Sequence, residues 1–245
     1  MIGRRDWSLN SALRHSCWRL WFVSGKAAVG ANVLRSRSAR IVSVFALLIF
    51  VLSMSLLADE TASTTDAAIR ELVGRGAIIK RFEAREAETV GLLVRLKALH
   101  LDAMGRVEPM VIDQLVKIPD LALELRSLPL SDDGLKLLLH RINPIGLDLS
   151  GSNVTNRGFA AVTQAEKLRW LDISFTKIGD DGLKSLTKLR ELRHASIIKC
   201  PISDEGLAHL ESLRSLREIY LSETRVSDHG VTRLQQRLPK CRIER

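Results

Sequence analysis

The sequence predicts an α/β solenoid, with a curved parallel sheet on its concave side and helices on its convex side, preceded by one transmembrane helix. Three observations predict this fold class. A 24-residue periodicity runs through the second half of the chain, eighteen consecutive residues near the N-terminus carry no charge, and only 4% of the residues are aromatic. A repetitive stack can fill its core with Leu, Ile and Val alone, whereas a compact globular enzyme usually also contains large rings.

Residues 1–40 form a basic tail that we expect to be cytoplasmic. They hold eight Arg and Lys residues against a single acid, Asp6, and so carry most of the net charge of +9. Residues 59–245 hold 29 bases and 27 acids with the two signs interspersed. Because the excess charge lies in the tail, the sequence indicates no nucleic-acid groove and no nucleic-acid partner.

Residues 41–58 (IVSVFALLIFVLSMSLLA) are predicted to cross the membrane once. As a helix they would rise about 27 Å, close to the roughly 30 Å thickness of the hydrocarbon layer. The basic flank on the N-terminal side places that end in the cytoplasm and the repeats on the extracytoplasmic side. A buried core helix is the simpler alternative, but such helices seldom have this one-sided charge flank.

Other interpretations of the N-terminus remain open. A signal peptide would be cleaved after a small-x-small pattern, but Leu56 and Glu60 occupy the −3 positions before Ala58 and Ala62. An organelle transit peptide is a minor option, and the aromatic residues of the tail are compatible with binding along a lipid surface. Whether Met1 is the true start is not decided by the sequence.

A polar linker is expected at residues 59–66 (DETASTTD), followed by a helix at residues 67–73. The sequence Gly-Arg-Gly at residues 74–76 would end that helix. Residues 67–98 do not follow the repeat, and we assign them to an N-terminal cap.

The 24-residue repeat occupies residues 99–235. At that shift apolar residues fall into common columns, and five glycines fall into another. Two strand columns are Leu123, Leu147, Leu171, Ala195 and Ile219, and Leu125, Leu149, Ile173, Ile197 and Leu221; the glycine column is Gly134, Gly158, Gly182, Gly206 and Gly230. Upstream of residue 121 the agreement is weaker, because Leu99 and Leu101 fit but Met110 stands where glycine is expected.

Each repeat predicts a strand, a turn and a helix. Leu171 and Ile173 alternate with polar residues, as in a strand with one buried face. Ser131, Thr155, Gly179, Ser203 and Ser227 hold the helix N-cap position, and the acids that follow suit the positive end of a helix. One helix face is lined every third residue by Leu183, Leu186 and Leu189. Since no unit can bury its own apolar face, neighbouring units must stack.

The pattern LxxLxLxxTxIxDxGLxxLxxL resembles the leucine-rich-repeat family, and residues 168–183 match it best. The resemblance is specific over residues 121–235 and implies a curved solenoid used for protein recognition. Residues 236–245 would then form a C-terminal cap. Similar repeats follow F-box segments in ubiquitin-ligase adaptors, although residues 1–58 do not look like an F-box.

The sequence predicts no catalytic residue, metal, cofactor or small-molecule substrate. Within their repeats, Cys200 lies three residues after a strand-column position and Cys241 lies four residues before the next one. This difference of seven residues corresponds to roughly 23 Å along the strands, too far for a disulfide, so we expect two buried thiols. Cys17 lies apart in the tail. The six histidines share no ligand spacing, and no HExxH, GxSxG, P-loop or CxxC pair is present.

The outward strand positions are expected to form a partner-binding surface on the concave face. Trp170 and Tyr220 carry rings of the kind that anchor interfaces, although Trp170 has the simpler interpretation of packing over its neighbours. The candidate residues are Trp170, His194, Tyr220, Asp148, Asp172, Ile198 and Glu218.

Three functions follow from this pattern. The first is a membrane-tethered module that binds a protein partner without catalysis. The second is a ubiquitin-ligase adaptor, which requires the repeats to be cytoplasmic. The third is an enzyme, which would have to work with His194 together with Asp148 or Asp172.

Overall fold

The computed structural model describes residues 60–84 and 89–245. The predicted basic tail, residues 1–40, and the predicted transmembrane segment, residues 41–58, lie outside this part and stay predictions. Within the residues described, no helix is both long and apolar enough to cross a bilayer. The unit formed by residues 59–245 is compact by itself.

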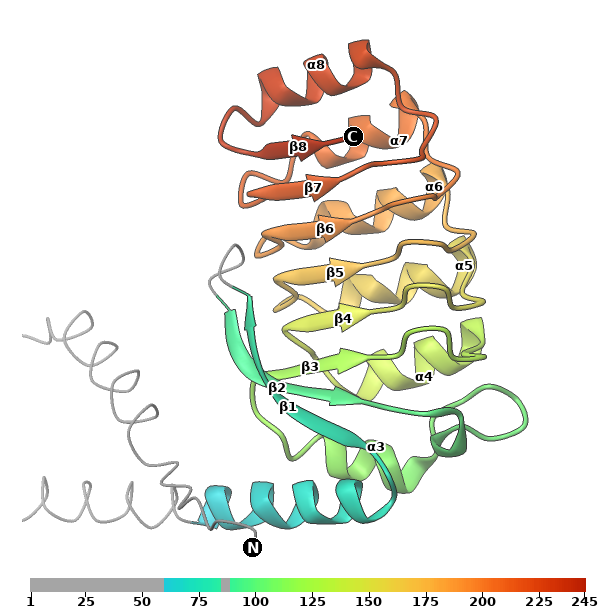
Figure 1. Cartoon of the computed structure of the whole chain (residues 1–245), viewed down its shortest axis with the longest axis vertical. Helices are drawn as coiled ribbons and strands as arrows, with labels where there is room; N and C mark the ends of the chain where they lie inside the picture. The colour runs from blue at the N-terminus through green and yellow to red at the C-terminus, as the bar shows by residue number, and fades with distance from the viewer. Residues whose placement is uncertain (1–59, 85–88) are drawn as a thin grey trace, which may run out of the picture. The chain divides into compact units, whose positions relative to one another are not determined.

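The sheet has its strands in chain order, side by side (Figure 1). Only β1 and β2 are antiparallel, and every later pair is parallel. From β3 onward, paired residues are 24 positions apart, as Leu147 and Leu171 are. The strands are β1 Ile78–Ala84, β2 Thr89–Arg95, β3 Leu121–Glu124, β4 Gly146–Asp148, β5 Trp170–Asp172, β6 His194–Ser196, β7 Glu218–Tyr220 and β8 Arg242–Glu244.

Helices follow the strands and cover one side of the sheet (Figure 1). We call the other side the sheet face. The α-helices after β2 are α3 Pro109–Leu115, α4 Asp132–Arg141, α5 Asn156–Phe159, α6 Asp180–Leu183, α7 Asp204–Leu210 and α8 Asp228–Arg237; the 3₁₀ helices there are η2 Ala98–His100, η3 Ala160–Gln164 and η4 Lys184–Lys188. The parallel sheet with helices on one side confirms the α/β class expected from the repeat.

The core lies between the sheet and the helices. Leu171 and Ile173 from β5 and its continuation are fully buried, as the alternation predicted. The fully buried helix residues of the same unit are Leu183, Leu186 and Leu189. Their three-residue spacing matches a structure in which α6 passes directly into η4, because a 3₁₀ helix has three residues per turn.

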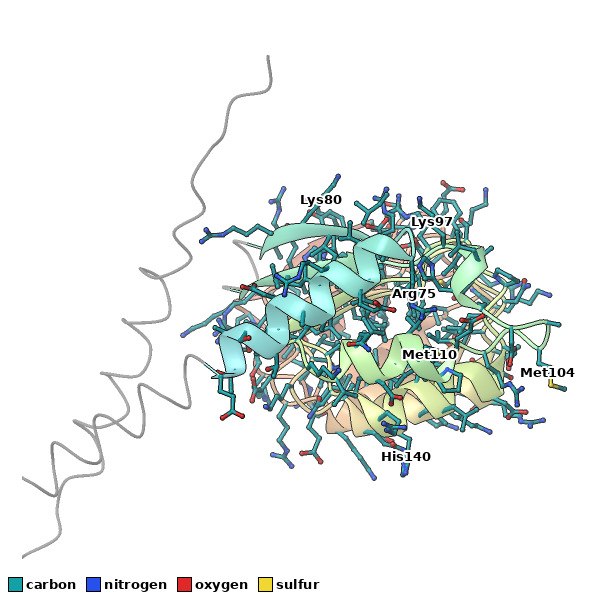
Figure 2. All side chains as sticks on the ribbon, turned by 90° about the horizontal axis from the view of Figure 1, so that it is seen from below. Arg75, Lys80, Lys97, Met104, Met110 and His140 are labelled. Atoms are coloured by element: carbon teal, nitrogen blue, oxygen red, sulfur yellow. The ribbon has the colours of Figure 1, made fainter. Side chains whose placement is uncertain are left out.

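The prediction of a polar linker at residues 59–66, before the helix, is wrong, because a helix extends over residues 60–74. Ala68 and Leu72 are fully buried and anchor this helix. The Thr65 hydroxyl donates to the carbonyl of Lys117 at 3.0 Å, and so ties the expected linker to the chain after α3. Figure 2 shows this helix beside α3, where Arg75 reaches Met110 with 3.9 Å between Nη2 and Sδ.

The placement of Leu99 in a strand column is also wrong. The strand before β3 is β2, and its Val94 pairs with Leu123, a shift of 29 residues. Leu99 lies in η2 with 59% of its surface exposed. The connection between β2 and β3 is therefore longer than those between later strands. Within it, the Asp102 carboxylate accepts hydrogen bonds from the backbone N–H groups of Met104 and Arg106 at 2.9 and 3.0 Å and so holds a turn together.

The C-terminal cap predicted at residues 236–245 contains one more strand of the sheet. β8 continues the 24-residue register, so that Arg242 pairs with Glu218 and Ile243 with Ile219. The last helix before it, α8, is capped by Ser227, whose hydroxyl accepts from the Gly230 N–H at 3.1 Å.

The helix-start acids connect neighbouring repeats, which their sequence pattern did not reveal. The Asp180 carboxylate accepts from the backbone N–H and the hydroxyl of Ser203, the N-cap of the next repeat, at 2.8 and 2.7 Å. Asp132 bonds Thr155 in the same way, and Asp204 bonds Ser227. These acids therefore act between repeats as well as on their own helix dipole.

The glycine column makes room for these acids. A Cβ atom added to Gly206 would lie 2.2 Å from the Asp180 carboxylate, and one added to Gly230 would lie 2.2 Å from that of Asp204. The glycines are therefore required by a close approach between repeats.

We expect Gly206→Ala to destabilise the domain by about 2 kcal/mol, since the added methyl must displace the Asp180 carboxylate from its bonds to Ser203. Urea unfolding followed by circular dichroism would measure the loss. Gly74→Ala is the matched control, because nothing lies within 4 Å of the new methyl and alanine favours a helix. Equal stability of the two variants would contradict the role of the column.

Candidate functional site

Strands β5, β6 and β7 present three rings to the sheet face. Trp170 pairs with His194 across β5 and β6, and Ser196 of β6 pairs with Tyr220 of β7. The rings of Trp170 and His194 are stacked with centroids 6.1 Å apart and planes 16° apart. The rings of His194 and Tyr220 are tilted by 52° with centroids 5.5 Å apart. The structure thus brings together the three rings singled out in the sequence, which we call the ring row.

Glu218 is a buried carboxylate that contacts two residues of the ring row, His194 and Tyr220. Its side chain is only 5% exposed, and His194 Nδ1 lies 3.2 Å from Oε2. The Tyr220 hydroxyl donates to Oε1 at 2.8 Å, and the Arg242 guanidinium lies 3.3 Å from the same oxygen. A buried carboxylate is stable only when such partners satisfy it. The hydrogen bond to Glu218 is also the main reason that the pKa of Tyr220 is raised.

Arg242 is a site residue that sequence analysis missed, because residues 236–245 were assigned to a cap. The signal was present in the repeat, since Arg242 lies one 24-residue step after Glu218 and two steps after His194. Extending the column beyond residue 235 would have found it.

Asp148 and Asp172 lie beside the ring row on β4 and β5, and each is engaged locally. Asp148 Oδ1 accepts from the backbone N–H and hydroxyl of Ser150 at 2.8 and 2.6 Å, and Arg126 lies 3.4 Å from Oδ2. Asp172 accepts from the Ser174 N–H at 2.8 Å. Burial raises the pKa of the Asp148 carboxyl, against the opposing hydrogen bonds from Ser150.

The acid that contacts His194 is therefore Glu218, and not Asp148 or Asp172 as the enzyme hypothesis required. Among the described residues, no group of three His, Cys, Asp or Glu side chains could hold a metal ion. Cys200 and Cys241 are separate buried thiols, and burial raises the pKa of Cys241 to about 11.

Ile198 lies two residues beyond the end of β6 and is half-buried. Its backbone N–H donates to the Ser174 hydroxyl at 3.1 Å, and the hydroxyls of Ser174 and Ser196 are 2.8 Å apart. These bonds join the chain beyond β5 to the end of β6 and to the residues that follow it. Towards β3 the face continues with an ion pair of 2.7 Å between Arg95 and Glu124.

The three rings are half-buried in the sheet face. Two hollows of the described surface lie elsewhere, one on the helix side between Leu137, His140 and Ala161 and the other near Ile118 and Asn143. Neither hollow is lined by a residue of the ring row, and three half-buried rings side by side suit contact with a large partner.

The comparisons with known proteins agree with the repeat. Residues 164–186, which include Trp170, match the model of the Leucine Rich repeat family. No curated protein sequence matches the chain.

Several solved structures are similar. An internalin C2 of Listeria monocytogenes is 25% identical, with 56% of each chain covered and a TM-score of 0.42. A leucine-rich-repeat protein of Leptospira interrogans is 20% identical over 57% of this chain and 34% of its own, with a TM-score of 0.41. A further Listeria internalin is 14% identical over 59% of this chain and 44% of its own, with a TM-score of 0.39. This chain thus spans from about a third to just over half of their lengths.

We expect Glu218→Gln to lower the pKa of Tyr220, since the carboxylate that accepts the phenol's hydrogen bond, and whose negative charge disfavours ionisation of the phenol, is removed. Tyr220 is the only tyrosine of the chain, so absorbance at the phenolate band reports this group alone, with circular dichroism as a check that the fold persists. Glu124→Gln, on the same face but away from the rings, is the control and should leave the titration unchanged. A titration unaltered by Glu218→Gln would show that this hydrogen bond does not form in solution.

Proposed function

We propose that this chain is a non-catalytic recognition module that is tethered to a membrane by residues 41–58 and binds a protein partner through the sheet face. The observation that carries the proposal is the ring row of Trp170, His194 and Tyr220, held by the buried Glu218. Leucine-rich-repeat folds generally serve protein recognition, and residues 164–186 match that family.

The ring row has the properties of an interface anchor. Aromatic residues give large contact areas at a small entropic cost, because few of their bonds rotate. Here the bonds to Glu218 restrict His194 and Tyr220 before any partner arrives. Less ordering is then needed on binding, which favours affinity. The same bonds commit the only histidine of the ring row to a structural partner, which supports binding over catalysis.

The membrane tether is proposed from the sequence. Residues 41–58 lack charge and follow eight basic residues in the tail, and this asymmetry favours a cytoplasmic N-terminus with the repeats on the extracytoplasmic side. Residue 60 is already helical and lies two positions after the segment, so that little free chain would separate the domain from the bilayer.

We expect Trp170→Ala to weaken partner capture by about 2 kcal/mol, roughly 30-fold, as loss of a central aromatic anchor does. Proximity labelling and capture with the full chain, quantified by mass spectrometry, would compare the variant with the wild type. Phe175→Ala is the control, because Phe175 is 56% exposed but lies at the turn after β5, outside the ring row. If Trp170→Ala and Phe175→Ala captured every protein equally well, the proposal that the sheet face binds the partner would be rejected.

We expect residues 59–245 to be cleaved by a protease added to intact cells, and residues 1–40 to be protected. Epitope tags at the two ends, followed by immunoblotting before and after permeabilisation, would test the orientation. Protection of both ends until permeabilisation would reject the proposed topology and would suit a cytoplasmic adaptor instead. Release of the chain by a carbonate wash would reject the tether.

A further inference from the structure

The strand ends at the left of Figure 1 form a basic edge. It consists of the four segments that lead into β5 to β8, residues 163–169, 187–193, 211–217 and 235–241. These segments contain nine Arg and Lys residues and three acids, a net charge of +6, whereas residues 59–245 as a whole carry only +2. The remainder of the domain is therefore acidic, and positive charge is concentrated along one edge.

The repeat brings arginines of the basic edge into register. Arg169, Arg193 and Arg217 each precede a strand, and their backbones are joined directly. The Arg193 N–H donates to the Arg169 carbonyl at 2.9 Å, and the Arg217 N–H donates to the Arg193 carbonyl at 2.7 Å. Rows bonded in this way lie about 4.8 Å apart. Arg190 and Arg214 form a second column, each in the same turn geometry of its repeat.

Acids neutralise this edge only in part. Glu191 pairs with Arg169 at 3.1 Å, and Glu211 pairs with Arg237 at 3.4 Å. Arg190, Arg214 and Arg217 are exposed and have no ion pair with any described residue. Arg214 and Arg217 donate instead to backbone carbonyls.

Like charges in neighbouring rows repel one another and destabilise a sheet. A helix C-terminus attracts bases to its last turn, but this does not account for Arg169, Arg193 and Arg217, which lie next to the strands. An acidic ligand along the edge would relieve the repulsion.

We propose that the basic edge docks an acidic, extended polypeptide segment of the partner, an inference that rests on the proposed protein-binding function. The planar guanidinium group matches the two oxygens of a carboxylate. The edge is continuous with the ring row, since Arg169 precedes Trp170 and Arg193 precedes His194. The small net charge of residues 59–245 favours a short acidic segment over a polynucleotide, which is attracted by a more extensive positive field.

The test uses the full chain in detergent at low ionic strength with an octaglutamate peptide that carries a photo-cross-linker. Cross-linked positions are identified by mass spectrometry, which separates the edge from the basic tail. We expect cross-links at residues 187–193 and 211–217, reduced at least tenfold by Arg190→Glu with Arg214→Glu. Lys177→Glu with Arg225→Glu is the matched control, with two exposed bases at the opposite ends of the strands, and should leave the cross-links unchanged.

Three results would overturn the inference: cross-links confined to residues 1–40, equal losses in both double variants, or displacement of the peptide by oligothymidylate as readily as by unlabelled octaglutamate. Thermal unfolding of each variant shows whether the fold is retained. Because no natural partner is present, failure of this assay leaves the Trp170→Ala capture result intact. Trp170→Ala itself should retain the peptide cross-links.

Discussion

A hydrogen-bonded contact between the acid at the start of one helix and the cap of the next determines how this protein stacks. Asp180 accepts two bonds from Ser203, and the space it occupies is available only because residue 206 is glycine. Where the cap is Gly179 and lacks a hydroxyl, Asn156 replaces the acid and accepts the one remaining N–H at 2.8 Å. This contact therefore couples the helix-start acid of one repeat to the cap and the glycine of the next, and it holds neighbouring repeats at a constant 24-residue step.

The constant step also produces the candidate site. Each outward side chain meets the residue 24 positions away, so one column places Trp170, His194, Glu218 and Arg242 in consecutive rows. Burying Glu218 would be unfavourable in isolation, but the histidine, the tyrosine hydroxyl and the arginine around it satisfy the carboxylate. The same register aligns the arginines of the basic edge, so binding features and stacking have a common geometric origin.

The sequence alone determined the strand columns, the N-caps and the outward strand positions that hold Trp170 and His194. These depend on periodicity, and a period of apolar, glycine and hydroxyl residues specifies how identical units must stack, whatever their detailed packing. The α/β class followed from the same pattern. The helix side was less well determined, because leucines spaced by three residues are compatible with an α-helix as well as with the observed 3₁₀ turn of η4.

Only the tertiary structure decided the features that depend on contacts between non-periodic segments. Residues 60–66 are helical in a segment whose Ser and Thr content favoured a linker, and Leu99 is exposed because β2, 29 residues before β3, takes the strand position. It also decided that the acid contacting His194 is Glu218 rather than Asp148 or Asp172. A sequence column identifies which side chains are near, but rotamers and competing hydrogen bonds, such as those from Ser150 to Asp148, decide which of them touch.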